Sequence, residues 1–285
     1  MKFGLIGHPI EHSLSPALFK AGYDGMYPYD LIITEDFEEA YRIFLEGYDG
    51  INVTAPFKEL ALKKADILSE ECQKIGATNL LIKTAGGIMA HNSDYLGVRL
   101  WIEEISRLAS LTRNDRETTR NDREAARNDR EAVQNDKEGR DIEEKTTVLI
   151  VGMGGAGKAA AEAARSLGCK VILMNRTQYS DEIRPLGEFK EAFKVADIVI
   201  YNLPVRLPEL DRIGKEDFIE GKPKNILEAN YRNPSFDKDL IQKLEGMHPQ
   251  IRYTGGETWL LLQALTGYEI FTGQKPDLEK MAARL

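Results

Sequence analysis

The stretch Thr146–Gly157, TTVLIVGMGGAG, decides the fold that we predict for this chain. Apolar and β-branched residues come first, as in a buried strand, and a glycine-rich string follows them. An Ala-rich segment of strong helical propensity then continues to Gly168. A strand, a glycine-rich turn and a helix in this order place backbone N–H groups and a positive helix end around a pyrophosphate. We therefore expect a Rossmann-type domain whose dinucleotide contacts include Gly152, Gly154, Gly155 and Ala156.

The end of the next strand indicates which dinucleotide binds. Lys170–Met174 is the expected strand, and Arg176 follows it, 24 residues after Gly152 (176 − 152). An NAD site usually has a carboxylate here to bind the ribose 2′-hydroxyl. A guanidinium pairs instead with a 2′-phosphate. We therefore favour NADP(H) over NAD as the cofactor.

Working outward, the chain shows an α/β pattern in two parts. After the glycine string, strands over 196–201 and 225–228 alternate with helices, as in a parallel sheet with right-handed crossovers. Before it, we expect strands over 2–6, 29–34 and 50–54, a helix over 59–70, a hairpin over 79–83 and 87–91, and a helix over 96–108. The predicted domains are a substrate domain, residues 1–98 completed by C-terminal helices in 256–285, a linker and insertion, residues 99–145, and a Rossmann-type NADP domain, residues 146–255.

The insertion contains four near-copies of a seven-residue unit. Residues 112–139 read TRNDRET, TRNDREA, ARNDREA and VQNDKEG. Seven is the coiled-coil period, but these units have no large apolar pair to bury in a seam. We interpret the charged heptad repeats as a solvated insertion between the domains, and expect its deletion to leave activity largely intact.

Composition excludes several classes of protein. The 285 residues have a net charge of −8, which disfavours a nucleic-acid binder. Cys72 and Cys169 do not form a disulfide framework, and the four histidines lack the spacing of a zinc site, so we expect no metal. The chain shows no long apolar run and no signal-peptide pattern. We expect a cytoplasmic enzyme of small molecules, without nucleic-acid or membrane partners, and leave monomer or homodimer open.

Polar strings in both halves together identify a family. The strings are GHPIEHSLSP (7–16), NVTAPFK (52–58), GATN (76–79), NSDYLG (92–97), GMGGAG (152–157), NRT (175–177) and GETWLLLQ (256–263). Each alone is weak, since a Ser-x-Ser-Pro string is a common helix start and a lone lysine is usually a solvated charge. In this order they resemble the shikimate dehydrogenase family, and the resemblance covers nearly the whole chain outside 112–141.

The resemblance implies an activity and a set of site residues. It implies NADP-dependent, reversible reduction of 3-dehydroshikimate to shikimate, a step of chorismate and aromatic amino-acid biosynthesis. Lys58 and Asp94 would be the catalytic pair, with the lysine exchanging the proton. Ser13 and Ser15 would bind the substrate carboxylate. The ring and its hydroxyls would contact Thr54, Asn79, Asp94, Tyr231 and Gln263. Further cofactor contacts would be Asn175, Thr177 and Gly256.

The chain departs from the family pattern mainly beside the cofactor. Residues 201–207, YNLPVRL, lack the hydroxyl and the glycine of the family's loop, Glu228 replaces a common Asp, and Trp259 replaces Met. We therefore expect an altered cofactor preference before a lost activity. The alternatives are an NAD-dependent quinate/shikimate dehydrogenase, a non-catalytic metabolite-binding protein and another two-domain enzyme of the methylene-tetrahydrofolate dehydrogenase type.

Overall fold

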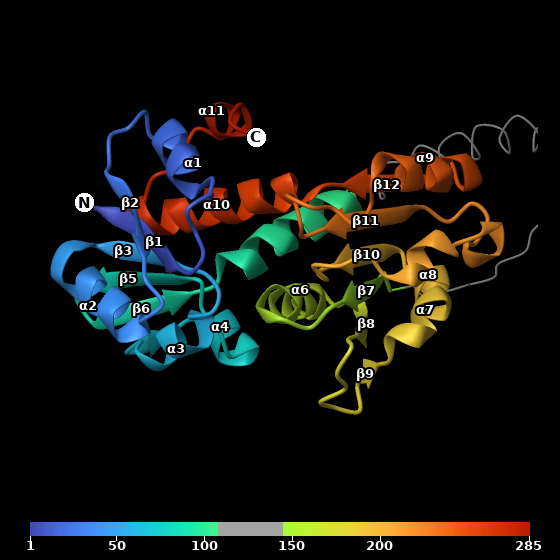
Figure 1. Ribbon diagram of the computed structural model, residues 1–285, viewed down its shortest axis with the longest axis horizontal. Coiled ribbons are helices and arrows are strands. Elements are labelled where there is room, and N and C mark those ends of the chain that lie inside the picture. Colours follow the sequence, from blue (N-terminus) through green and yellow to red (C-terminus); the bar gives the residue numbers. More distant parts are fainter. Residues whose placement is uncertain (108–144) are drawn as a thin grey trace, which may run out of the picture.

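Two sheets build the molecule, and each forms the centre of one lobe (Figure 1). The computed structural model describes residues 1–107 and 145–285. Both sheets have six strands, and helices cover both faces of each. The α/β architecture with a Rossmann-type second lobe, predicted from the sequence, is confirmed. The heptad repeats lie outside the described residues.

The second sheet contains β7 (Thr147–Val151), β8 (Lys170–Met174), β9 (Ile183–Arg184), β10 (Ile198–Tyr201), β11 (Lys224–Glu228) and β12 (Ile251–Thr254). All its pairings are parallel, in the order β12-β11-β10-β7-β8-β9. Alternate residues of β7 enter different cores, because side chains along a strand point to opposite faces. After β9 the chain returns to the other side of β7. The crevice beyond β7 and β10 is thus the switch point at which α/β sheets bind ligands.

The first sheet is mixed. Its strands are β1 (Phe3–Gly7), β2 (Tyr29–Ile33), β3 (Gly50–Val53), β4 (Ile67–Leu68), β5 (Leu80–Thr84) and β6 (Gly87–His91), in the order β2-β1-β3-β5-β6-β4. The first three are mutually parallel, whereas β5 is antiparallel to β3 and to β6. The carboxyl ends of β1 and β3 face the second lobe, and the segments that follow them carry the predicted substrate residues.

The helices of the first lobe are α1 (Ser15–Gly22), α2 (Phe37–Gly47), α3 (Lys58–Lys63) and α4 (Glu70–Ile75). A further helix covers residues 93–107. The second lobe contains α6 (Gly155–Ser166), α7 (Phe189–Val195), α8 (Pro208–Asp211) and α9 (Lys238–Met247), with single 3₁₀ turns η1 (Leu186–Glu188) and η2 (Lys215–Asp217). The chain ends in α10 (Gly256–Thr272) and α11 (Leu278–Ala282).

The C-terminal helices return to the first lobe (Figure 1). The ring of Phe271 on α10 stacks on that of Phe3 on β1, with centroids 4.9 Å apart. Met281 of α11 is fully buried in the same core. Such aromatic and aliphatic burial fixes α10 against the first sheet. Because α10 starts beside the second sheet, it spans both lobes.

The predicted helix over 59–70 is wrong. The helix α3 ends at Lys63, and residues 67–68 form β4, which pairs in parallel with β6. The Asp66 carboxylate accepts the Ile88 N–H at 2.8 Å and so fixes this edge. Leu60, part of the apparent apolar period, is 43% exposed. Pairing with the sheet edge outweighs the helical pattern, which periodicity alone could not reveal.

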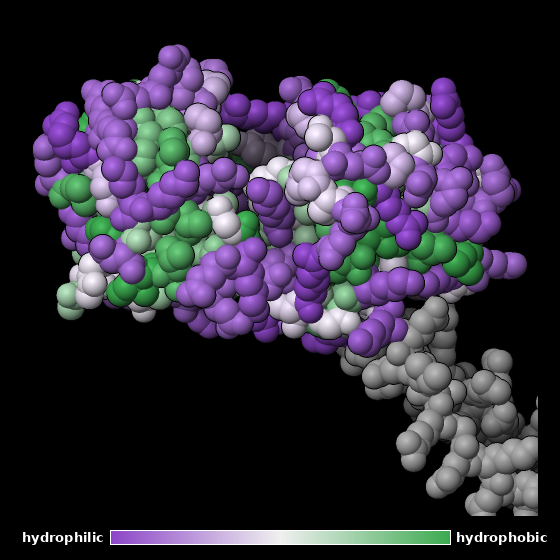
Figure 2. Space-filling view, turned by 90° about the horizontal axis from the view of Figure 1, so that it is seen from below, coloured by the Kyte–Doolittle hydropathy of each residue, from purple (hydrophilic) through white to green (hydrophobic). Residues whose placement is uncertain are grey.

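The outer surface is mostly hydrophilic on the face that Figure 2 shows, and apolar residues gather there in separate areas on both lobes. Within the described residues, no helix has the length and hydrophobicity needed to cross a membrane.

Candidate active site

A pocket of about 380 Å³ lies where the two lobes meet. Its walls come from β1, β3 and their following loops, from the helix over 93–107, from the loop after β11 and from α10. It collects every residue predicted for catalysis or substrate binding. These are Ser13, Ser15, Thr54, Lys58, Asn79, Asp94, Tyr231 and Gln263.

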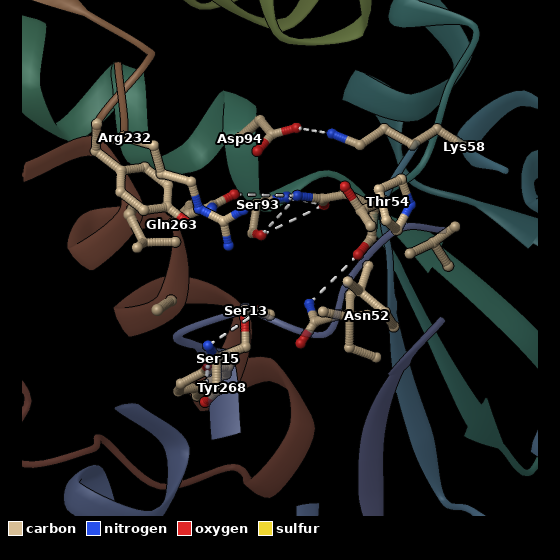
Figure 3. A pocket seen from close by; sticks show the side chains of 18 of the residues that line it. Ser13, Ser15, Asn52, Thr54, Lys58, Ser93, Asp94, Arg232, Gln263 and Tyr268 are labelled. Atoms are coloured by element: carbon tan, nitrogen blue, oxygen red, sulfur yellow. Dashed lines mark hydrogen bonds and ion pairs between the residues drawn. The ribbon is translucent and has the colours of Figure 1, made fainter. Parts of the chain in front are cut away.

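Lys58 and Asp94 form an ion pair inside this pocket (Figure 3). Lys58 is the first residue of α3, just beyond β3, and Asp94 is in the first turn of the helix over 93–107. The Lys58 Nζ lies 2.5 Å from the Asp94 Oδ2, with only 20% and 9% of the two side chains exposed. The indole N–H of Trp259 donates to the Asp94 carbonyl at 3.1 Å. The hydrogen bond from Trp259 of α10 therefore holds the backbone of Asp94, and with it the Asp94 carboxylate, in place.

A second cluster of neutral polar groups lies beside the ion pair. The Asn79 Oδ1 accepts the Ser93 N–H at 2.7 Å, and its Nδ2 donates to the Ser93 Oγ at 3.0 Å and the Gln263 Oε1 at 3.5 Å. Close helix packing makes this possible, because a Cβ on Gly97 would lie 2.7 Å from the Gln263 N. The cluster offers donors and acceptors to a ligand that carries several hydroxyls.

The two predicted carboxylate-binding serines form one hydroxyl pair. The Ser13 Oγ donates to the Ser15 Oγ at 3.1 Å and accepts the Ser15 N–H at 3.2 Å. Ser15 begins α1, and the Tyr268 hydroxyl on α10 donates to its carbonyl at 3.0 Å. Burial raises the pKa of Tyr268, so this phenol stays a neutral donor. The hydrogen bond from Tyr268 thereby holds the serine pair in place in the pocket lining.

The glycine-rich loop reaches the ion pair from the second lobe. Gly152 has φ +93°, and a Cβ on Gly157 would lie 1.9 Å from the Gly152 carbonyl oxygen, so the tight turn requires glycine at both positions. A Cβ on Gly155 would meet only the Lys58 Cδ, at 3.6 Å, and one on Gly154 would have no neighbour within 4 Å. The loop therefore leaves open space directly beside Lys58.

The other predicted cofactor residues lie around this loop. The Asn175 Oδ1 accepts the Met153 N–H at 3.3 Å, and Arg176 and Thr177 are exposed at the end of β8. Gly256 lies at the start of α10, where a Cβ would come within 2.6 Å of the Ala229 carbonyl oxygen. Gly256 thus allows α10 to begin against the loop that contains Tyr231.

The loop over 201–207 departs from the family pattern, and the Tyr201 hydroxyl links its two ends. The Tyr201 hydroxyl donates to the Val205 carbonyl at 2.7 Å and accepts the Leu207 N–H at 3.1 Å. The neighbouring Asn202 lies against Gly157, and its buried Oδ1 has no hydrogen-bond partner in the described part of the chain. An orphaned acceptor beside an open glycine loop fits a polar ligand at this place.

Comparisons with known proteins agree with this arrangement. Residues 5–81 match the family model described as the shikimate dehydrogenase substrate binding domain. Residues 107–245 match that of the D-isomer specific 2-hydroxyacid dehydrogenase, NAD binding domain. A shikimate dehydrogenase (NADP(+)) of Pyrococcus furiosus is 26% identical over 304 residues, which cover 98% of this chain and 93% of the relative. The chain is therefore similar to the shikimate dehydrogenase family along nearly its whole length.

Other similar proteins differ in length or in the cofactor bound. A pentafunctional AROM polypeptide of Candida tropicalis is 30% identical over 253 residues, 86% of this chain but 13% of that protein. The chain likewise spans 17% of the corresponding protein of Scheffersomyces stipitis. A solved shikimate 5-dehydrogenase of Thermus thermophilus, in complex with NADP(H) and shikimate, has a TM-score of 0.70 and 24% identity, covering 100% of this chain and 98% of that one. A quinate dehydrogenase of Corynebacterium glutamicum in complex with NAD has a TM-score of 0.73 and 20% identity, covering 100% and 98%.

Sequence reasoning missed several residues of the pocket. Asn52 and Ser93 line it, and both occur inside strings already singled out, NVTAPFK and NSDYLG. Tyr268 and Arg232 also line it. Neither belongs to one of the quoted strings, so only the fold could bring them to the site.

Proposed function

We propose that this protein catalyses the reversible, NADP(H)-dependent reduction of 3-dehydroshikimate to shikimate. The observation that carries the proposal is the partly buried Lys58–Asp94 ion pair, which lies between the neutral polar cluster and the glycine-rich loop. The named activity of the full-length relatives and the NADP(H) and shikimate bound in the Thermus thermophilus enzyme support it.

Lys58 handles the proton in this reaction. NADP(H), when bound, would supply or accept a hydride at the ring carbon, and negative charge would then develop on the carbonyl oxygen during reduction. The Lys58 ammonium stabilises that charge and donates the proton, and the neutral amine takes the proton back in the oxidation. Asp94 orients the ammonium at 2.5 Å and accepts a hydrogen bond from the adjacent ring hydroxyl.

The remaining polar groups of the pocket bind the substrate. Asn79 and Gln263 are linked to each other and bind ring hydroxyls from one side, and Thr54 does so from the loop after β3. Ser13 and Ser15, which lie apart from the ion pair in the view of Figure 3, would bind the carboxylate. Tyr231 closes the pocket from the second lobe.

The residues around the glycine loop fit a dinucleotide. The pyrophosphate would lie on the N–H groups of Gly154, Gly155 and Ala156 at the start of α6, in the open space beside Gly154. Arg176 would pair with the 2′-phosphate, with Asn175 and Thr177 shaping the turn around it. Gly152 and Gly256 provide close backbone approach, and the Asn202 Oδ1 would accept a hydrogen bond from the cofactor.

Absorbance of the reduced nicotinamide, followed with shikimate or quinate and with NADP or NAD in all four pairings, tests the function. We expect the highest kcat/KM with shikimate and NADP. A preference for quinate and NAD would favour the alternative dehydrogenase. Activity in none of the pairings would overturn the proposal and leave a metabolite-binding protein or a different two-domain enzyme.

Oligomeric state and location stay predictions. We propose a monomer or a homodimer acting in the cytoplasm, without nucleic-acid or membrane partners. Light scattering on the purified protein would give the mass in solution, and a mass above twice 32.1 kDa would contradict this part of the proposal.

A further inference from the structure

The charged side chains of the pocket leave one positive charge uncompensated. Among the lining residues only Lys58, Asp94 and Arg232 are charged. Lys58 and Asp94 neutralise each other through their ion pair. Within residues 1–107 and 145–285, no carboxylate forms an ion pair with Arg232. The pocket therefore has a net positive wall, which favours an anionic ligand.

Arg232 reaches across the boundary between the lobes. It lies on the loop between β11 and α9, in the second lobe, and its Nη2 donates to the His12 carbonyl at 2.5 Å, in the loop that leads to α1. His12 directly precedes Ser13, one of the two serines of the hydroxyl pair. The side chain extends into the pocket in Figure 3. A guanidinium has five N–H donors, so this one bond leaves others for a ligand.

The loop that carries Arg232 is held by its own hydrogen bonds. The Asn230 Oδ1 accepts the Arg232 N–H and the Asn233 N–H, both at 3.2 Å. The buried Glu228 carboxylate accepts the Ser235 N–H at 2.5 Å and the Phe236 N–H at 3.2 Å. These bonds restrict the loop before a ligand arrives, which lowers the entropic cost of using Arg232 in binding.

We infer that Arg232 determines substrate specificity, by binding the substrate carboxylate from the second lobe while Ser13 and Ser15 bind it from the first. The inference rests on the proposed function. A guanidinium carries a formal positive charge and can pair bidentately with a carboxylate, so it distinguishes a carboxylate from an uncharged ester more strongly than two neutral hydroxyls do. The preferred ligand class is thus a hydroxylated ring that bears one carboxylate, and an ester of the same ring is a poor ligand.

The test compares shikimate with its methyl ester, which keeps the ring hydroxyls and removes the charge. Dissociation constants come from isothermal titration of the full chain, and kcat/KM from nicotinamide absorbance. The variants are Arg232→Met, which keeps an unbranched side chain without charge, and Arg232→Lys, which keeps the charge. Arg252→Met on β12 is the matched control, because it removes an exposed arginine that does not line the pocket.

We expect Arg232→Met to weaken shikimate binding about 10-fold to 100-fold, as loss of a hydrogen bond to a charged group does, and to leave ester binding unchanged. Arg232→Lys should restore part of the affinity for shikimate, and Arg252→Met should match the wild type. Equal losses for shikimate and the ester would make Arg232 a structural contact and overturn the inference, as would no loss for either. Failure of the wild type to bind or oxidise shikimate would instead overturn the proposed function.

Discussion

At the scale of single residues, the site depends on side chains that hold the two charges in place. Asp94 contacts Lys58 through its carboxylate and Trp259 through its carbonyl. The family string places Trp259 on the same helix face as Gln263, four residues further on. The indole thus links the proposed catalytic pair to α10, the helix that also carries the pocket residue Gln263.

Trp259→Phe should lower kcat/KM about 5-fold, because it removes one buried hydrogen bond, worth about 1 kcal/mol, that orients Asp94. We expect the change in kcat and not in KM, measured with shikimate and NADP. Trp101→Phe makes the same aromatic exchange in the same core without touching the bond to Asp94, and should leave kcat unchanged. Equal kinetics for both variants would show that the indole has no positioning role.

Arg176→Met should raise the KM for NADP about 10-fold to 100-fold and leave the KM for NAD nearly unchanged, because in the proposed function the guanidinium pairs only with the 2′-phosphate, which NAD lacks. Steady-state kinetics with both cofactors check this. Lys170→Met is the matched control, since Lys170 is exposed at the opposite end of β8. A similar loss for NAD would mean that Arg176 does not select the cofactor.

Which residues line the pocket was the part of the site that sequence could predict best, and the reason is local. Lys58, Asp94 and the serine pair sit in short strings whose order along the chain is distinctive, and the fold brings all of them into one pocket. Arg232 and Tyr268 reach the pocket only through the packing of a loop and of α10. Such contacts depend on the positions of whole elements and have no local pattern.

At the scale of elements, the contact between α10 and the helix over 93–107 shapes the pocket. Gly97 lies against the Gln263 backbone, and a Cβ on Gly267 would lie 3.1 Å from the Ser93 side chain. Both glycines let the helices approach closely enough for Asn79 to contact Gln263. A larger residue at Gly97 must push the helices apart, and one at Gly267 must displace the Ser93 side chain.

Gly97→Ala should destabilise the protein by about 1 to 2 kcal/mol, since overpacking outweighs the better helix propensity of alanine. Activity with shikimate should also fall, because Gln263 moves away from Asn79. Gly246→Ala on α9 is the control, as a Cβ there would have no neighbour within 4 Å. Thermal unfolding and kcat/KM report both effects, and a Gly97→Ala protein as stable and active as the control would contradict the packing argument.

Glu71 on α4 contacts His91 at the end of β6 and the Asn92 N–H that follows it, and its contribution to stability depends on pH. Burial opposes its ionisation, but hydrogen bonds from His91 and from the Asn92 N–H outweigh burial and lower its pKa from 4.5 to about 2. The folded state therefore favours the carboxylate. This contribution is complete above pH 4.5 and is lost as the pH falls towards 2.

Glu71→Gln should lower the free energy of unfolding by about 2 kcal/mol at pH 7. The difference from the wild type should stay constant between pH 7 and 5 and shrink below pH 4.5, as urea unfolding at each pH would show. A difference that persists unchanged at pH 3 would mean that the carboxylate charge is not responsible.

Secondary structure was predictable where a segment has one dominant signal. The strands on either side of the glycine string match the prediction, because they are short, apolar and bounded by turn residues. Residues 59–70 have an apolar period but divide into a helix end, a strand and a new helix. The partner of that strand, β6, is formed by residues 20 positions later, which a local pattern cannot contain.

At the scale of the whole molecule, each of the two lobes supplies part of the pocket lining. The first lobe holds Lys58 and Asp94. The second brings the glycine loop beside Lys58, where a Cβ on Gly155 would lie 3.6 Å from the Lys58 Cδ, and brings Arg232 to the loop that contains His12. In the proposed function, an acidic chain of net charge −8 would thus bind anionic ligands through a few local groups and not through its overall field.

The central claim is that Lys58 exchanges the substrate proton in a shikimate dehydrogenase. Its most direct test is kcat for shikimate oxidation by Lys58→Met, with the shikimate dissociation constant measured on the same protein and Lys63→Met, exposed at the end of α3, as control. We predict that kcat falls about 10²-fold to 10⁴-fold while the dissociation constant changes little. A Lys58→Met protein that turns over shikimate at nearly the wild-type rate would contradict the claim.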